Sequence, residues 1–197
     1  MPIHFYALLS RMKYILRWGL MRQSRPENLS EHTADTAILA HALAVIGNRR
    51  LGRSYNPGQV ALYALYHDCS EIITGDLPTP IKYENDSIRS AYKAVEQKAA
   101  RRLGRLLPQD LREEYQPYLD GPQGETARLV KAADKLSALI KCIEEEAAGN
   151  REFCRAREAS LAALTAMELP EAEIFLRECL PSYGLSLDEL KETPSQG

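Results

Sequence analysis

Apolar residues recur at three- and four-residue steps along most of the chain, and alternating apolar and polar stretches are nearly absent. Three- and four-residue spacing places apolar side chains on one face of an α-helix, whereas a strand needs alternation. The sequence therefore predicts an all-α fold, a bundle of about eight helices. Besides the two helices described next, the pattern predicts helices at about 4–18, 86–105, 109–119, 125–147, 151–167 and 171–180.

Two central helices carry clear end signals. Ser30 is a suitable N-cap for SEHTADTAILAHALAVIGN, which closes at Gly47. Asn56 followed by Pro57 caps and opens PGQVALYALYHDCSEIIT, and Gly75 ends it. The proline-rich DLPTPIKY that follows is expected to be a rigid loop.

The composition is that of an ordinary globular protein. The 197 residues are 45% apolar and 26% charged, enough for one domain with a substantial core. We expect one domain over residues 1–190 and a flexible C-terminal tail over 191–197, because TPSQG is polar. The net charge of −2 and the pI near 6.1 supply no broad basic surface, so we expect no nucleic acid partner.

Cysteine spacing and hydropathy bear on location. The four cysteines (Cys69, Cys142, Cys154 and Cys179) form no CxxC pair, and the first residues lack the order of a signal peptide. No window approaches the roughly 18 apolar residues that a membrane span needs. We therefore expect a soluble protein of the reducing cytoplasm, without a membrane partner.

Candidate chemistry begins in the second central helix, at YHDCSE. His67 and Glu71 are four residues apart, and Asp68 and Glu71 three, so a continuous helix would place these side chains on one side. His32, in the first turn of its helix, and Asp134, within VKAADKLSALIKC, are groups of the same kind. Three packed helices can therefore bring two imidazoles and two carboxylates to one metal ion, leaving Glu71 as an unligated acid or base.

Simpler interpretations of these residues remain open. A single histidine in a helix is more often a core or surface side chain than a ligand. Asp68 and Asp134 lie where apolar residues dominate, but a salt bridge to Arg or Lys would satisfy a buried carboxylate without a metal. Cys69 points about 100° away from Asp68 on the helix and lacks a suitably spaced histidine, so we interpret it as a small core residue.

The ordered set of His32, then adjacent His67 and Asp68, then Asp134 on a later helix resembles the HD-domain phosphohydrolases. Their all-α core binds a divalent cation through a motif of the form H…HD…D. Three stretches narrow the resemblance: ILRWGLMRQSRPENLSEH, ALYHDCSEIITGDLPTPIKY and LVKAADKLSALIKCIEEEAAGN look like those of the bacterial 5'-deoxynucleotidases. Those enzymes remove phosphate from deoxyribonucleoside 5'-monophosphates. The likeness covers nearly the whole chain.

The resemblance implies metal ligands, a catalytic carboxylate and substrate contacts. The metal ligands would be His32, His67, Asp68 and Asp134, the catalytic carboxylate Glu71, and the substrate contacts Arg17, Trp18, Asp76, Leu77, Pro78 and Thr79 together with His32, Asp68 and Asp134. Arg17 offers forked, permanently charged donors for a phosphate. Taken without the resemblance, Arg17 is better explained as an arginine that the dipole favours at a helix end. Trp18 would pack on the sugar and leave no room for a 2'-hydroxyl. Taken without the resemblance, Trp18 is better explained as a core or interface residue. Asp76 would accept from the sugar hydroxyls or simply make a local turn.

One divalent metal is expected. In many HD enzymes Gly-Lys follows the HD dipeptide and further histidines bind a second metal, whereas here Cys-Ser-Glu follows and no adjacent histidine pair is present. Two nitrogens and two carboxylates are compatible with manganese, cobalt, iron, nickel, zinc or magnesium, and we expect activity to favour a transition metal such as cobalt or manganese. In the proposed mechanism, water attacks phosphorus while Arg17 orients the phosphate and Glu71 acts as general acid or base. The resemblance also implies a homodimer and a small nucleotide substrate.

Two other functions remain open. The first is another reaction of an HD-domain hydrolase, on a dNTP or a cyclic nucleotide. A triphosphate would call for several cationic side chains near the metal, and the nearby candidates are Arg17, Arg22, Arg25 and Lys82. The second is a non-catalytic metal- or nucleotide-binding module, in which the His/Asp set only joins three helices.

Overall fold

The computed structural model describes residues 2–82 and 84–191, and the side chains of residues 79 and 80 fall outside this description. Regular structure in the described part is helical, apart from one isolated bridge between Leu16 and Asn28, so the all-α prediction is confirmed. The elements are α1 (Phe5–Leu9), η1 (Ser10–Tyr14), α2 (Leu29–Arg50), α3 (Pro57–Tyr66), α4 (Glu71–Thr74), α5 (Thr79–Lys82), α6 (Asp86–Gly104), α7 (Gln109–Asp120), α8 (Gly124–Ala147), η2 (Arg151–Phe153), α9 (Cys154–Thr165), α10 (Pro170–Glu178), η3 (Leu180–Gly184) and α11 (Leu187–Lys191).

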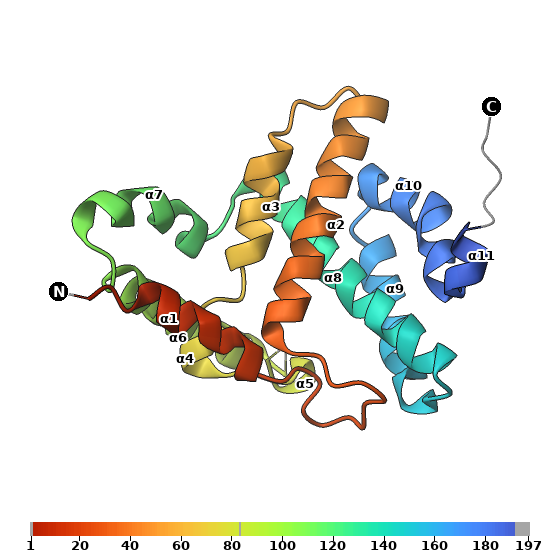
Figure 1. Cartoon of the computed structure of the whole chain (residues 1–197), viewed down its shortest axis with the longest axis horizontal. Coiled ribbons are helices and arrows are strands. Elements are labelled where there is room, and N and C mark those ends of the chain that lie inside the picture. Colours follow the sequence, from red (N-terminus) through yellow and green to blue (C-terminus); the bar gives the residue numbers. More distant parts are fainter. Residues whose placement is uncertain (1, 83, 192–197) are drawn as a thin grey trace.

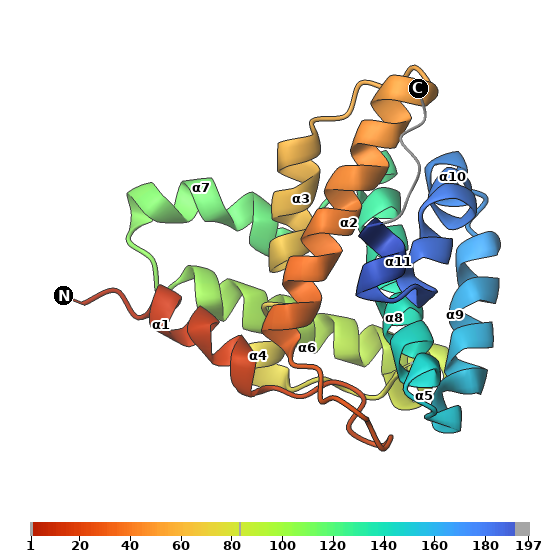
Figure 2. The same ribbon diagram turned by 45° about the vertical axis from the view of Figure 1, so that its right-hand side comes forward.

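Helices α2, α3 and α8 form the centre of the bundle. Helix α2 packs against both α3 and α8, and α9 packs on α8 (Figure 1). Segments α1, α4, α5 and α6 gather near the N-terminal end of α2 in both views, whereas α10 and α11 lie on the opposite side of the bundle from α7 (Figure 2). The first turn of α2 and the C-terminal end of α3 therefore face the same region.

The core consists of two clusters of buried apolar residues. The larger one joins α2, α3, α8, α9 and α10, and includes Leu43, Val60, Leu136, Leu164 and Phe175. The smaller one lies among α1, α6 and α7, and includes Phe5, Cys69, Leu103, Leu107 and Leu119. Ala64 belongs to the first cluster and Cys69 to the second. The chain thus passes from one core to the other at the residues that carry the candidate chemistry.

The helix predicted over 57–74 is broken, which corrects the expectation of one continuous helix. Helix α3 ends at Tyr66, and α4 begins at Glu71. Between them Cys69 N donates to Tyr66 O at 3.1 Å and Glu71 N to Asp68 O at 2.9 Å, which are three-residue bonds. Such tight turns eclipse residues three apart, so Asp68 and Glu71 still share a side. The predicted four-residue alignment of His67 with Glu71 does not hold.

The first predicted helix, 4–18, is also too long. Its helical part ends at Tyr14, and Ile15 is extended. The antiparallel bridge between Leu16 and Asn28 closes a loop. We call residues 15–28 the N-terminal loop. Trp18 in this loop has a φ of 60°, which an L-residue rarely adopts.

Other boundaries differ by a few residues. The N-cap of α2 is Asn28 and not Ser30, because the Asn28 side chain accepts from the backbone N–H groups of Ser30 and Glu31, at 3.0 and 3.1 Å. The carboxylate of Glu31 in turn accepts from Asn28 N, which completes a capping box. The predicted helix 151–167 is η2 followed by α9, 171–180 is α10 and the start of η3, and part of the predicted rigid loop is α5.

Two sequence expectations concern the ends and the surface. The expected tail, 191–197, lies outside the described residues except for Lys191, which ends α11. Among the helices that the structure describes, none combines the length and the apolar character needed to cross a membrane.

Candidate active site

Four predicted residues meet where α2, α8 and the turn after α3 come together. His32 is fully buried, and its Nε2 lies 3.5 Å from Asp68 Oδ2 and 3.2 Å from Asp134 Oδ1. His67 Nε2 lies 3.0 Å from Asp68 Oδ2 and 3.9 Å from Asp134 Oδ1. One donor atom each of His32, His67 and Asp68 fall within 4.8 Å of one another. The structure thus brings together residues that lie up to about a hundred positions apart in the chain.

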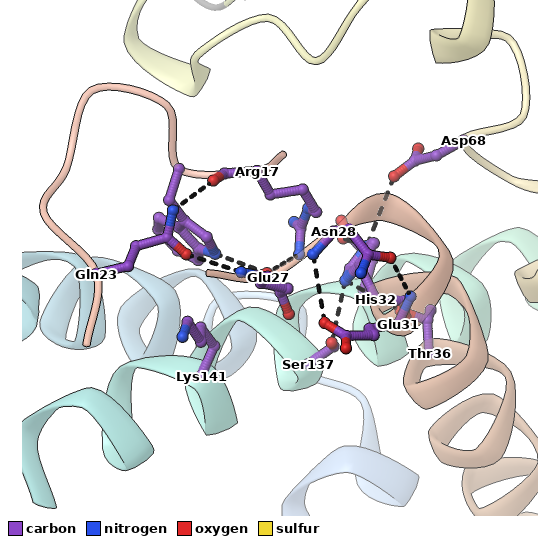
Figure 3. A network of polar contacts seen from close by, with 12 residues as sticks. Arg17, Gln23, Glu27, Asn28, Glu31, His32, Thr36, Asp68, Ser137 and Lys141 are labelled. Atoms are coloured by element: carbon purple, nitrogen blue, oxygen red, sulfur yellow. Dashed lines mark hydrogen bonds and ion pairs between the residues drawn. The ribbon is translucent and has the colours of Figure 1, made fainter. Parts of the chain in front are cut away.

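The two imidazoles are oriented as metal-binding imidazoles are. His67 Nδ1 lies 2.6 Å from Ala64 O, and because a carbonyl can only accept, this nitrogen carries the proton. His32 Nδ1 lies 3.0 Å from Ser137 Oγ, beyond which Figure 3 shows the ring reaching toward Asp68. Both Nε2 atoms are buried without a hydrogen-bond partner among the described residues. A buried ring nitrogen that faces two carboxylates fits a divalent cation, which would take the place of the proton on that nitrogen.

The charges of the cluster follow from its packing. Burial alone would raise the pKa of Asp68 and of Asp134, but the two imidazoles outweigh burial and hold both pKa values well below the usual range. Burial alone would lower the pKa of His67, but Asp68 and Asp134 raise it well above its ordinary value. Both carboxylates are therefore ionised, which is the form that binds a cation.

Glu71 lies beside this cluster in a different environment. Its side chain is buried, and its Oε2 has no hydrogen-bond partner within the described part of the chain. Burial, followed by the charges of Asp68 and Asp76, raises the pKa of Glu71 to about 9. Lys82 Nζ lies 3.9 Å away, but it pairs more closely with Glu96, at 2.7 Å. Glu71 thus carries a proton at neutral pH in this arrangement.

Arg17 and Trp18 lie in the N-terminal loop and not in a helix. The Arg17 side chain is largely buried, and its Nη1 donates to Glu27 Oε2 at 2.8 Å. Burial alone would lower the pKa of Arg17, but Glu27, Asp134, Asp68 and Asp76 together raise it. The guanidinium therefore stands in the field of the His/Asp cluster.

The predicted contact segment 76–79 follows a turn at Gly75. Gly75 has a φ of 75°, and its N–H donates to Glu71 O at 2.7 Å, so α4 ends at this glycine and the chain leaves the helix there. Burial raises the pKa of Asp76, while Arg17 acts against it, which places Asp76 within the electrostatic reach of the site. Leu77 and Pro78 are partly buried, and the side chain of Thr79 lies outside the described residues.

Cys69 is a core residue, as its sequence context predicted. Its side chain is 2% exposed, and burial raises the pKa of its thiol to about 12. A thiol that stays protonated at neutral pH is not a nucleophile.

Sequence reasoning missed the residues that hold the N-terminal loop in place. Glu145 is buried in α8 and accepts from Ser24 N at 2.7 Å, from Lys141 Nζ at 2.5 Å and from Asn150 Nδ2 at 2.8 Å. Glu145 is the middle of three consecutive glutamates, a pattern typical of a solvated surface. Asp134, Lys141 and Glu145 are spaced seven and four residues apart, which is the helical signal that could have found this anchor.

Known proteins resemble this chain over nearly its whole length. The family model described as 5'-deoxynucleotidase YfbR-like matches residues 4–183. The chain is 48% identical over 191 residues to the 5'-deoxynucleotidase YfbR of Escherichia coli, covering 96% of each chain. It is 47% identical over 189 residues to the 5'-deoxynucleotidase VP0926 of Vibrio parahaemolyticus, covering 95% of this chain and 97% of the relative.

Solved structures share the fold. An HD-domain phosphohydrolase from Listeria innocua superposes with a TM-score of 0.79 at 23% identity, over 97% of this chain and 93% of that chain. The HD phosphohydrolase DatZ of cyanophage S-2L, bound to dA and one catalytic Zn2+ ion, superposes with a TM-score of 0.65 at 17% identity, over 89% of this chain and 96% of that chain. The chain thus has the helical fold of these HD-domain proteins. Within that class, the chain belongs to the 5'-deoxynucleotidase YfbR-like family.

The anchor at Glu145 predicts a pH-dependent stability. Burial would raise the pKa of Glu145, but hydrogen bonds from Lys141 and Ser24 lower it from 4.5 to about 2. Because the folded pKa is depressed, this contribution is complete above about pH 4.5 and is lost as the pH falls toward 2. Urea unfolding of Glu145→Gln should therefore depend less on pH between about 5 and 3 than that of the wild type.

Glu146→Gln is the matched control, since Glu146 pairs with Arg157 at 3.4 Å near the surface. Parallel pH profiles of the wild type and Glu145→Gln would contradict the anchor.

Proposed function

We propose that this chain is a metal-dependent phosphomonoesterase that hydrolyses deoxyribonucleoside 5'-monophosphates to a deoxyribonucleoside and phosphate. The observation that carries the proposal is the cluster of His32, His67, Asp68 and Asp134, whose buried Nε2 atoms face two ionised carboxylates. Relatives that are 47% and 48% identical over nearly the full length are named 5'-deoxynucleotidases, which supports the substrate class.

The four clustered residues would hold one divalent cation, which neutralises phosphate charge and lowers the pKa of a bound water. Two imidazole nitrogens and two carboxylates suit cobalt, manganese or a similar transition metal. The single catalytic zinc ion of DatZ, a structure with the same fold, supports one metal per site.

The remaining residues act on the substrate. Arg17 binds the phosphate oxygens and orients them for in-line attack by water, because a guanidinium presents several donors in a fixed plane. Glu71 acts as general acid or base, which its buried, unpartnered Oε2 supports. The contacts to the nucleotide would come from Arg17, Trp18, Asp76, Leu77, Pro78 and Thr79, with His32, Asp68 and Asp134 at the metal.

The surroundings of the site favour a monophosphate over a triphosphate. Arg22 is 94% exposed and pairs with Glu152, and Arg25 is 78% exposed and pairs with Glu31. Lys82 pairs with Glu96. Arg17 also pairs with a carboxylate, but its side chain is only 13% exposed and its charge is acted on by Asp134, Asp68 and Asp76, so Arg17 is the principal cation for the phosphate.

We also propose that the protein is a cytoplasmic homodimer. Its four cysteines are free thiols, as a reducing compartment keeps them. Ile38 on α2 and Leu161 on α9 are 67% and 39% exposed, which leaves apolar surface for a second copy. Light scattering at micromolar concentration should give twice the chain mass, and a monomer would contradict the proposal.

The substrate proposal predicts a specific pattern of phosphate release. Deoxyribonucleoside 5'-monophosphates such as dAMP should be hydrolysed, and dATP, cyclic AMP and 3'-monophosphates should not. Chelator should abolish the activity, and cobalt or manganese should restore it more fully than magnesium. The measurement is a panel of these nucleotides, deoxy and ribo, with each metal. Nucleotide binding without phosphate release under any metal would favour the non-catalytic module instead.

The role of Glu71 predicts a selective loss of turnover. Glu71→Ala should lower the rate on dAMP by about a hundred- to ten-thousandfold, because a positioned acid or base typically contributes that much. Metal and nucleotide binding, measured by calorimetry, should change little, since Glu71 is not proposed as a ligand. Cys69→Ala, which removes a neighbouring core thiol, is the control and should retain most turnover. Wild-type rates for Glu71→Ala would remove Glu71 from the mechanism.

A further inference from the structure

We propose that Glu27 is a positioning residue, which fixes the phosphate-binding Arg17 and the sugar-facing Trp18 relative to each other through one carboxylate oxygen. This inference rests on the proposed function, in which Arg17 binds the phosphate and Trp18 contacts the sugar. It adds a residue to which that mechanism gives no role, and one that lies outside the His/Asp cluster.

The contacts of Glu27 converge on a single atom. Glu27 Oε2 accepts from Arg17 Nη1 at 2.8 Å and from Trp18 Nε1 at 2.8 Å. The Glu27 side chain is 9% exposed, so water competes little for these bonds. Hydrogen bonds to an ionised acceptor in such an environment are the strong ones. The guanidinium and the indole therefore share one fixed reference point.

The backbone repeats the same connection. Arg17 N donates to Glu27 O at 3.0 Å. The Gln23 amide spans the loop, since its Nε2 donates to Arg17 O at 2.8 Å and its Oε1 accepts from Glu27 N at 3.0 Å. Figure 3 shows Arg17, Gln23 and Glu27 joined in this way above α8. The carboxylate is thus itself held in place, as a positioning group must be.

Trp18 supplies an independent observation. Its φ of 60° lies in the left-handed region, where a bulky L-residue is strained. The conformation is held by the bond from the indole to Glu27, by packing on Phe153 with ring centroids 5.3 Å apart, and by a bond from Met21 N to Trp18 O at 2.8 Å. Strain of this kind persists only where the surroundings impose it, and it concentrates at functional sites.

The direction of Arg17 connects this arrangement to the chemistry. Nη1 of Arg17 is bonded to Glu27, and Asp134, Asp68 and Asp76 all act on the charge of the guanidinium, which therefore lies within electrostatic reach of the candidate metal ligands. Only one of its terminal nitrogens, Nη1, is bonded to Glu27 in the described structure, which leaves donors for a phosphate. Loss of Glu27 would let the guanidinium swing toward the aspartates and would free the indole.

Glu27→Gln keeps the size of the side chain and removes its charge. We expect kcat/KM for dAMP to fall about 10- to 100-fold, the usual effect of losing a group that orients a functional side chain. The preference for dAMP over AMP should fall several-fold as well, because the indole no longer has a fixed position. A purely structural glutamate would not move this ratio.

The single tryptophan gives a second readout that needs no activity. Trp18 emission should shift to the red and its quenching by acrylamide should increase in Glu27→Gln, since the indole loses a buried, charged acceptor. Glu31→Gln is the matched control, because Glu31 lies four residues away and bonds to Asn28 N and Arg25, and glutamine also completes a capping box. The control should keep the activity, selectivity and emission of the wild type.

The outcomes separate the two proposals. An active wild type whose Glu27→Gln variant has unchanged selectivity or unchanged Trp18 emission would overturn the positioning role, whatever its rate. A wild type that releases no phosphate from any nucleotide would overturn the proposed function, and the emission comparison would still decide whether Glu27 holds Trp18. If Glu27→Gln does not fold, Glu27→Asp, which keeps the charge but is one methylene shorter, carries the same measurements with the same two readouts.

Discussion

The structure depends on one buried imidazole. His32 is fully buried, yet its Nε2 faces Asp68 and Asp134 at 3.5 and 3.2 Å, and its Nδ1 contacts Ser137. A polar ring with such surroundings is stable only when each partner keeps its place. Helix α2 supplies the ring, α8 supplies Asp134 and Ser137, and the turn after α3 supplies Asp68. The packing of these three segments and the chemistry of the site are therefore one constraint.

The break between α3 and α4 serves that constraint. A continuous α-helix would place Asp68 and Glu71 about 60° apart around its axis, whereas three-residue bonds align them more closely. The same turn directs Cys69 into the smaller apolar cluster. Asp68 and Glu71 can then face the His/Asp cluster, while Cys69 between them faces the apolar core. The cost is a short, separate α4 in place of a longer helix.

The sequence predicts the residues of the His/Asp cluster better than the residues that support the N-terminal loop. His32, His67, Asp68 and Asp134 are recognisable because they are polar residues among apolar helical positions, and the structure brings all four together. The interiors of the helices were also predictable, because apolar residues recur there at helical spacing.

The misjudged features have two different origins. Ser30 and Asn28 are both good N-caps, but Glu31, three residues after Asn28, completes a capping box with Asn28, so the local pattern did contain this signal. Arg17 follows an apolar stretch with helical spacing, but pairing with Glu27 draws it into a loop. Nothing in the local sequence pattern indicates that Arg17 and Glu27 pair.

Helix α8 has a further consequence for how the site responds to perturbation. Asp134, Lys141 and Glu145 lie along one stripe of this helix, spanning about 16 Å of its axis. The first contacts His32, and the other two hold the segment that carries Arg17 and Trp18. A displacement of α8 would therefore shift the carboxylate of Asp134 and the guanidinium of Arg17 in the same direction. Helix α8 carries Asp134 and, through Lys141 and Glu145, also holds the loop of Arg17. A change in the packing of α8 far from the site would therefore move both of these oppositely charged groups.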